Sequence, residues 1–214
     1  MNTDALVEAL AKGPIAVGPR AVERRLGAAL AGGATLATLA MLAALGLRPD
    51  LHAALREPMF WAKLAYPLVL SLAAACATTV LARPAGRARR AAAASCAVAA
   101  AMVLAALGIL AIAPAGGRVA LAVGHSALAC VVAVAALSLP VFALAVVALR
   151  RCAPTRLRSA GAAAGLLAGA TAAAVYAWHC DETALPFLGL WYTLGMVMPA
   201  AIGAVLGPRL LRWA

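Results

Sequence analysis

Residues 91–113 read AAAASCAVAAAMVLAALGILAIA and contain no charged residue. At about 1.5 Å per residue, a helix of this length crosses the roughly 30 Å hydrocarbon core of a bilayer. The rest of the chain has the same character, because 66% of its 214 residues are apolar, 12% are charged and the mean hydropathy is +0.98. This composition excludes a water-soluble globular protein.

Runs long enough to span a membrane occur six times along the chain. They cover residues 26–47, 61–82, 91–113, 119–149, 159–178 and 187–207, and short segments that carry Arg, Pro, Gly or acidic residues connect them. Because about 20 apolar residues predict one transmembrane helix, the sequence predicts an all-α, polytopic membrane protein with six transmembrane helices. We divide the chain into an N-terminal segment, residues 1–25, and a six-helix transmembrane domain, residues 26–214.

The distribution of positive charge predicts the orientation of these helices. The chain carries 18 Lys and Arg against 7 Asp and Glu, which gives a net charge of +11. Most cations lie near the two termini and in two connections on the same side, which hold Arg83, Arg87, Arg89 and Arg90, and Arg150, Arg151, Arg156 and Arg158. The positive-inside rule makes this side and both termini cytoplasmic. The excess charge then reflects topology and contact with the lipid bilayer, with no direct nucleic-acid partner.

The sequence argues against an enzyme and against an ion-coupled transporter. It contains no Walker loop and no GxSxG, HExxH or CxxC motif. No ionisable residue lies near the middle of a predicted span, where coupled transporters place their proton or ion relays. Lys63 lies just inside the second span, and we expect its long side chain to extend outward to the interface without a functional role.

Two rows of glycine predict close contacts between helices. Gly161, Gly165 and Gly169 lie four residues apart on the fifth span, and Gly203 and Gly207 repeat the spacing on the sixth. Small residues at this spacing form a smooth stripe that lets two helix backbones approach. We therefore expect the last two spans to pack tightly against neighbouring helices.

Two of the five cysteines, Cys130 and Cys180, are predicted to lie at the same depth. Counting about 20 residues from the charged ends of the fourth and fifth spans puts both at the outer boundary, with His125 and His179 beside them. In an oxidising compartment the two thiols could form a disulfide, or all four side chains could bind a thiophilic metal ion. The shared depth is also compatible with no site at all, and the sequence leaves these alternatives open.

The other three cysteines have plainer interpretations. Cys76 and Cys96 fall within the second and third spans among small residues, and we interpret both as apolar fillers. Cys152 lies in a basic connection on the predicted cytoplasmic side, where reducing conditions disfavour a stable disulfide.

The N-terminal segment begins with a short predicted amphipathic helix. Thr3 is the predicted cap, and the acidic residues Asp4 and Glu8 favour the positive end of the helix. An apolar stripe is formed by Leu6, Val7 and Leu10. A helix of about two turns is not stable alone in water. Binding to a partner and a frayed terminus are the two interpretations, and the acidic residues argue against a lipid-seeking helix.

Several motifs together resemble one known family. They are YAWHC at 176–180, WYTLG at 191–195, GAVLGPRLLRW at 203–213, GLRPD at 46–50, Gly124-His125 followed by Cys130, and the N-terminal pattern Thr3-Asp4-x-Leu6-Val7-x-x-Leu10. Over its whole length the chain resembles the NrsF-type membrane anti-sigma factors, which were long known as a domain of unknown function.

This resemblance implies a role in transcription regulation and stress response. Members hold an extracytoplasmic-function sigma factor at the bacterial inner membrane through the cytoplasmic N-terminal region and loops. In the N-terminal region of this chain, the residues that would bind it are Thr3, Asp4, Leu6, Val7, Glu8 and Leu10. Two cysteines near the outer face are implicated in sensing oxidative or heavy-metal stress, and they correspond to Cys130 and Cys180. The competing hypothesis is a small redox- or metal-handling membrane protein, in which those two cysteines with His125 and His179 are the working site and the N-terminus is incidental.

Overall fold

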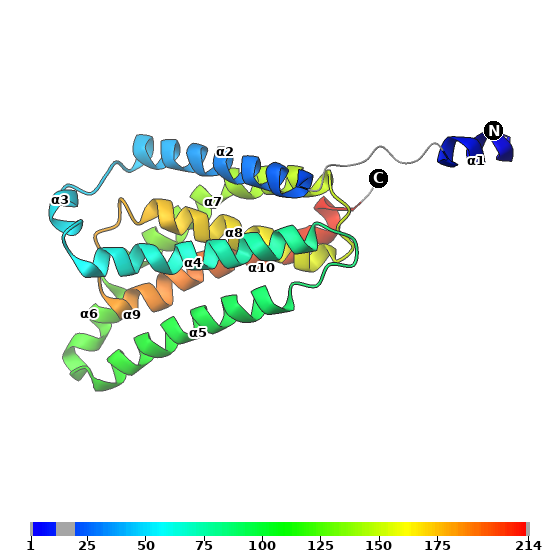
Figure 1. Ribbon diagram of the computed structural model, residues 1–214. Helices are drawn as coiled ribbons and strands as arrows, with labels where there is room; N and C mark the ends of the chain where they lie inside the picture. Colours follow the sequence, from blue (N-terminus) through cyan, green and yellow to red (C-terminus); the bar gives the residue numbers. More distant parts are fainter. Residues whose placement is uncertain (1, 12–19, 213–214) are drawn as a thin grey trace.

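The computed structural model describes residues 2–11 and 20–212, except for the side chains of Leu6, Ala9 and Leu10. Throughout that part of the chain the regular secondary structure is helical (Figure 1). The elements are α1 (Thr3–Ala11), α2 (Ala21–Ala44), α3 (Leu51–Ala54), α4 (Pro58–Leu81), α5 (Arg89–Ile112), a 3₁₀ turn (Ala115–Gly117), α6 (Arg118–Val123), α7 (Ala127–Arg150), α8 (Leu157–Tyr176), α9 (Leu185–Phe187), a π-helical turn (Leu188–Tyr192) and α10 (Thr193–Leu210). The motif residue Trp213 lies outside the described residues.

Six of the helical segments are long and apolar enough to cross a membrane, as the sequence predicts. The predicted boundaries shift at several helices. The first span begins at Ala21 and ends at Ala44, because Gly46 adopts a φ of +75° and closes the helix with a bond from its N–H to the Met41 carbonyl. The long fourth run is broken into α6 and α7 at Gly124, whose φ is +55°.

Helix α8 lies at the centre of the bundle and is the most buried of the six spans. Its glycine row packs against α10: a Cβ at Gly161 would meet the backbone of Gly203, and one at Gly165 would meet the backbone of Pro199. Gly169 faces Met196 in the same way. The predicted close contact is confirmed, and the structure adds that the two glycine-bearing spans pack against each other.

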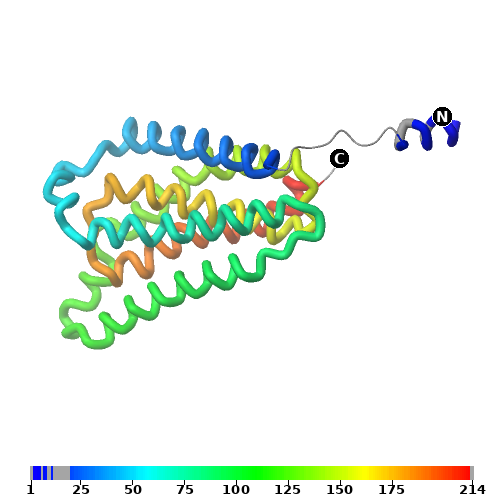
Figure 2. The backbone as a smooth tube through the Cα atoms, viewed as in Figure 1, coloured from blue at the N-terminus to red at the C-terminus, as the bar shows by residue number. Residues whose placement is uncertain are grey.

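The connections between helices gather at two ends of the bundle (Figures 1 and 2). One end, which we call the distal end, holds the α2–α4, α6–α7 and α8–α9 connections. Two hydrogen bonds link them there: the Arg48 N–H donates to the Trp178 carbonyl, and the His125 N–H donates to the Glu182 carboxylate. At the proximal end the α4–α5 and α7–α8 connections meet, where Ala153 donates its N–H to the Ala82 carbonyl at 3.2 Å. Helix α5 lies at the edge of the bundle and is the least buried span.

The N-terminal helix is present as α1, with one correction to its predicted cap. The helix begins at Thr3 itself, so the residue before it occupies the capping position. Asn2 accepts a hydrogen bond from the Asp4 N–H at 3.4 Å through its Oδ1. Asn2, one residue before the predicted Thr3, is therefore the residue that caps α1.

Candidate functional site

The two predicted sensor cysteines both lie at the distal end, and both are buried. Cys130 is in the first turn of α7 and is 0% exposed, and Cys180 follows α8 and is 3% exposed. Both are free thiols in one continuous core cluster, close enough to interact electrostatically. The sequence predicted their common depth but not their burial. We call residues 177–184, which carry Cys180 from α8 to α9, the Cys180 loop.

Lys63 on α4 holds the Cys180 loop from inside the protein. Its Nζ donates hydrogen bonds of 2.7 Å to the backbone carbonyls of Cys180 and Glu182, and lies 5.3 Å from the centre of the Tyr192 ring. The side chain is 0% exposed. The expectation that Lys63 extends outward to the interface is therefore wrong, because α4 turns this residue inward against two carbonyls that need donors.

Arg48 holds the same loop from the α2–α4 connection. Its guanidinium makes two hydrogen bonds of 2.7 Å to the carboxylate of Asp50 and one of 3.4 Å to the Cys180 carbonyl. Its backbone N–H donates to the Trp178 carbonyl at 3.2 Å. The hydrogen bond from Arg48 lowers the pKa of the Asp50 carboxyl, so the pair stays ionised at any pH above the ordinary carboxyl pKa.

Glu182 connects the Cys180 loop to the break between α6 and α7. Its Oε1 accepts the backbone N–H of His125 at 2.7 Å and lies 2.9 Å from His125 Nδ1. A Cβ at Gly124 would overlap this carboxylate, and the positive φ of Gly124 is one that L-residues rarely adopt. The Gly124-His125 motif thus makes a turn that fits the Glu182 carboxylate.

The four residues of the predicted metal site are not gathered into one group. His125 is turned toward acids, with its Nε2 3.2 Å from Asp181, and His179 Nδ1 is 3.1 Å from the Gly46 carbonyl. Within the described ranges, no three His, Cys, Asp or Glu side chains form a group that fits a metal ion. The geometry brings the two cysteines into one cluster and gives the two histidines different partners.

Two tyrosines complete the surroundings of the cysteines. Tyr176 packs with its ring centre 5.6 Å from His179 and 6.3 Å from Tyr192. The Tyr192 hydroxyl is buried and has no hydrogen-bond partner among the described residues. Tyr192 ends the π-helical turn, a local irregularity that often marks functional sites. Sequence analysis singled out neither tyrosine for a role, although both belong to quoted motifs.

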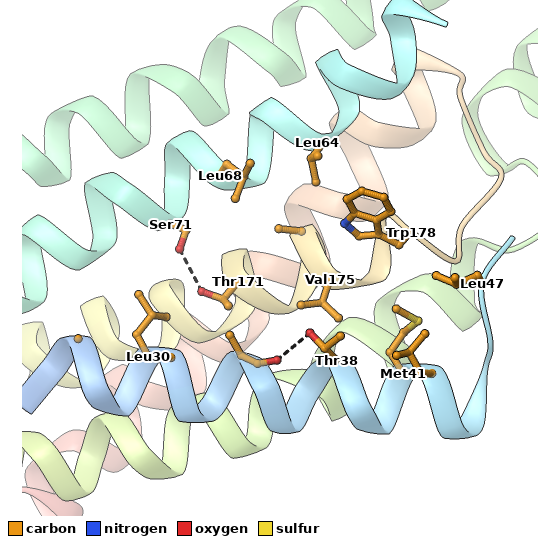
Figure 3. Close-up of a pocket in the computed structure, with 15 residues that line it drawn as sticks. Leu30, Thr38, Met41, Leu47, Leu64, Leu68, Ser71, Thr171, Val175 and Trp178 are labelled. Carbon is orange, nitrogen blue, oxygen red and sulfur yellow. Dashed lines mark hydrogen bonds between the residues drawn. The ribbon is translucent and has the colours of Figure 1, made fainter. Parts of the chain in front are cut away.

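An apolar groove runs along α8 below the Cys180 loop (Figure 3). It is a cavity of about 760 Å³ between α2, α4 and α8, and Trp178 and Leu47 line it at its distal end. Ser71 on α4 and Thr171 on α8 bridge its floor with a 3.0 Å hydrogen bond. The groove reaches the Cys180 loop, because Trp178 belongs to both.

The predicted partner-binding residues lie on α1. Thr3, Asp4, Val7 and Glu8 are exposed there, and Val7 is 59% exposed. The side chains of Leu6 and Leu10 lie outside the described part of the chain. The stripe therefore remains a prediction, carried by a helix whose existence the structure supports.

The remaining cysteines are separate from this site. Cys76 on α4 and Cys96 on α5 are exposed, so they do not fill closed helix interfaces as expected. Cys96 lines a cavity between α4, α5 and α8. Cys152 is half-buried in the α7–α8 connection and contacts the Ala148 carbonyl through its sulfur at 3.4 Å.

Known proteins resemble this chain from end to end. The model of the family "Negative regulator of sigma F" (NrsF) matches residues 10–213. A probable anti-sigma-F factor NrsF from Azospira oryzae is 42% identical, and the anti-sigma-F factor NrsF from Caulobacter vibrioides is 39% identical, each over 100% of both chains. No solved structure matches. The family resemblance predicted from the motifs is confirmed, and this chain belongs to the NrsF family of negative regulators of sigma F.

Proposed function

We propose that this protein is an inner-membrane anti-sigma factor that holds an extracytoplasmic-function sigma factor and releases it under redox or heavy-metal stress. The observation that carries the proposal is the full-length identity of 42% and 39% to two proteins named as anti-sigma-F factors. Six helices long and apolar enough to cross a membrane fit a multi-pass location, and the basic proximal end fits a cytoplasmic orientation with both termini inside.

The N-terminal helix is the proposed holding element for the sigma factor. α1 carries Asp4 and Glu8 on its surface, and a sigma factor exposes basic DNA-binding surfaces that would attract these acids. Leu6, Val7 and Leu10 recur at helical spacing and would fill an apolar groove of the partner. The partner would thus bind first of all through an acidic and apolar helix.

The sensing element is the pair Cys130 and Cys180. Formation of a disulfide removes two protons and two electrons from the thiols, and an oxidant such as a peroxide accepts them. Because both thiols are buried, the Cys180 loop must first open to admit the oxidant. Lys63, Arg48 and Glu182 fasten that loop, so their hydrogen bonds set how readily it opens.

Helices α8 and α10 would carry the change to the proximal end. The Cys180 loop leads from α8 into α9, which continues through the π-helical turn into α10, and the glycine rows hold the backbones of α8 and α10 in contact along the bundle. A shift at the distal end therefore moves both helices together rather than bending one. The α7–α8 connection, which precedes Leu157, would move with them and disturb a partner that rests on it.

A co-purification experiment tests the holding role. Membranes that contain tagged full-length protein should retain a sigma factor, identified by mass spectrometry, and Leu6→Asp should reduce the retained amount at least about tenfold, since a charge buried in an apolar groove costs a few kcal/mol. Ala5→Asp adds the same charge to an exposed position off the stripe and is the matched control. Equal retention by Leu6→Asp at normal protein levels would exclude α1 as the holding element.

A further inference from the structure

A second cavity lies toward the proximal end of the bundle, between α4, α5 and α8. It has a volume of about 380 Å³. Small apolar side chains line it along the spans, among them Ala74, Ala92 and Ala163. Three arginines, Arg87, Arg89 and Arg156, line its end at the α4–α5 and α7–α8 connections. The cavity is thus an apolar trough with a cationic mouth, separate from the Cys180 loop.

The side chains of the three arginines have no acidic partner among the residues that the structure describes. None of their guanidinium groups makes a hydrogen bond or an ion pair with another residue in the ranges 2–11 and 20–212. Other arginines at the same end do have partners, since Arg83 pairs with Glu23 and Arg150 donates to the Leu210 carbonyl. Guanidinium groups bind phosphate oxygens with charge-assisted, often bidentate hydrogen bonds, so this mouth matches a phosphate.

The cavity also lies at the depth of lipid headgroups. Arg89 begins the third span and Arg156 immediately precedes the fifth, so both lie where the chain enters the hydrocarbon layer. A phosphate that belongs to a lipid places its acyl chain in the apolar trough below the mouth. A free phosphate or an acidic peptide would neutralise the arginines and leave that trough unused.

We propose that this cavity binds one anionic phospholipid, with its phosphate between Arg89 and Arg156 and one acyl chain along the alanine-lined trough. Basic pockets between transmembrane helices bind anionic headgroups in this way. The bound lipid would link the two basic connections of the proximal end. It would also fill the space on the inner side of α5, the least buried span.

Native mass spectrometry of the purified full-length protein, titrated with phosphatidylglycerol, tests this site. The pocket variant Arg89→Gln/Arg156→Gln is compared with Arg90→Gln/Arg158→Gln, which removes the same charge from neighbouring positions that do not line the cavity. We expect the control to bind the first phosphatidylglycerol like the wild type, and the pocket variant to bind it at least about tenfold more weakly. Phosphatidylcholine should bind all three proteins weakly and equally.

A third variant separates shape from charge. Ala92→Leu fills part of the trough without changing any charge, at a position that is exposed and so tolerates a larger side chain. It should weaken phosphatidylglycerol binding several-fold. Equal weakening in both arginine variants, no effect of Ala92→Leu, or full displacement of the lipid by inorganic phosphate would overturn the proposal. Unchanged lipid binding in the pocket variant together with loss of a retained sigma factor would assign the mouth to a protein partner instead.

Discussion

Lys63 places an ammonium group in the interior of the distal end, where it is fully buried. A buried cation is tolerated only when its N–H groups are hydrogen-bonded, and here two of them bind the carbonyls of Cys180 and Glu182. These two carbonyls lie on either side of Asp181 in one irregular loop. The lysine therefore substitutes for the missing backbone donors and fixes the position of the Cys180 thiol.

Loss of the Lys63 donors should expose that thiol. Lys63→Met keeps the length of the side chain but leaves two buried carbonyls unpaired, and a hydrogen bond to a charged group contributes about 1.5–3 kcal/mol. We expect Cys180 in a protein with its other cysteines replaced by Ser to react with a maleimide at least about tenfold faster in Lys63→Met. Arg56→Met removes an exposed cation from the same end and should leave the rate unchanged. Equal rates in both variants would show that Lys63 does not hold the loop closed.

At this site the depth of a residue in the membrane is predictable from the sequence, but the direction in which its side chain faces is not. Cys130 and Cys180 could be brought together by counting residues from the charged ends of two spans, because depth in a bilayer follows length. The same argument places Lys63 at the interface. That prediction is wrong because depth does not reveal which way a side chain faces. A usable signal existed, because an ionisable residue inside a span indicates a functional position by default.

Among the helices, α8 and α10 pack backbone against backbone. Each glycine of the α8 row lies opposite backbone atoms of α10, so no side chain fits between them. The spacing of the glycines predicted a close contact but not its partner, because a stripe of small residues carries no information about the facing helix. The same limit applies to α6 and α7: the excess length of the fourth run was visible, but the break at Gly124 depends on the Glu182 carboxylate.

A single methyl group tests the α8–α10 contact. Gly165→Ala would place a Cβ against the backbone of Pro199, and overpacking of this kind typically costs about 1–3 kcal/mol. The variant should lower the melting temperature of the detergent-purified protein. Gly108→Ala is the control, because a Cβ there meets nothing within 4 Å and alanine favours the helix by up to about 1 kcal/mol. Equal stability of the two variants would mean that the helices are not held in contact at Gly165.

For the whole molecule, the proposed function needs its two ends on opposite sides of a membrane. The basic connections with Arg90 and Arg158 predict a cytoplasmic proximal end, and the Cys180 loop then faces the periplasm. Reporter fusions after Arg90 and Arg158 should be active in the cytoplasm, and fusions at Gly117 and Asp181 should be active in the periplasm. A fusion at Asp181 that reports cytoplasm would overturn the six-span orientation and separate the cysteines from an oxidising compartment.

The central claim is that the distal cysteine pair controls a sigma factor held at the other end. The fraction of the sigma factor in the membrane pellet, measured before and after addition of an oxidant such as diamide, tests it most directly. In the wild type this fraction should fall several-fold on oxidation. In Cys130→Ser, Cys180→Ser and the double variant it should stay at its starting value to the same extent, because a pair that acts together is lost with its first member. A sigma factor that is soluble before the oxidant is added, or that leaves the membrane equally in the wild type and the double variant, would contradict the account.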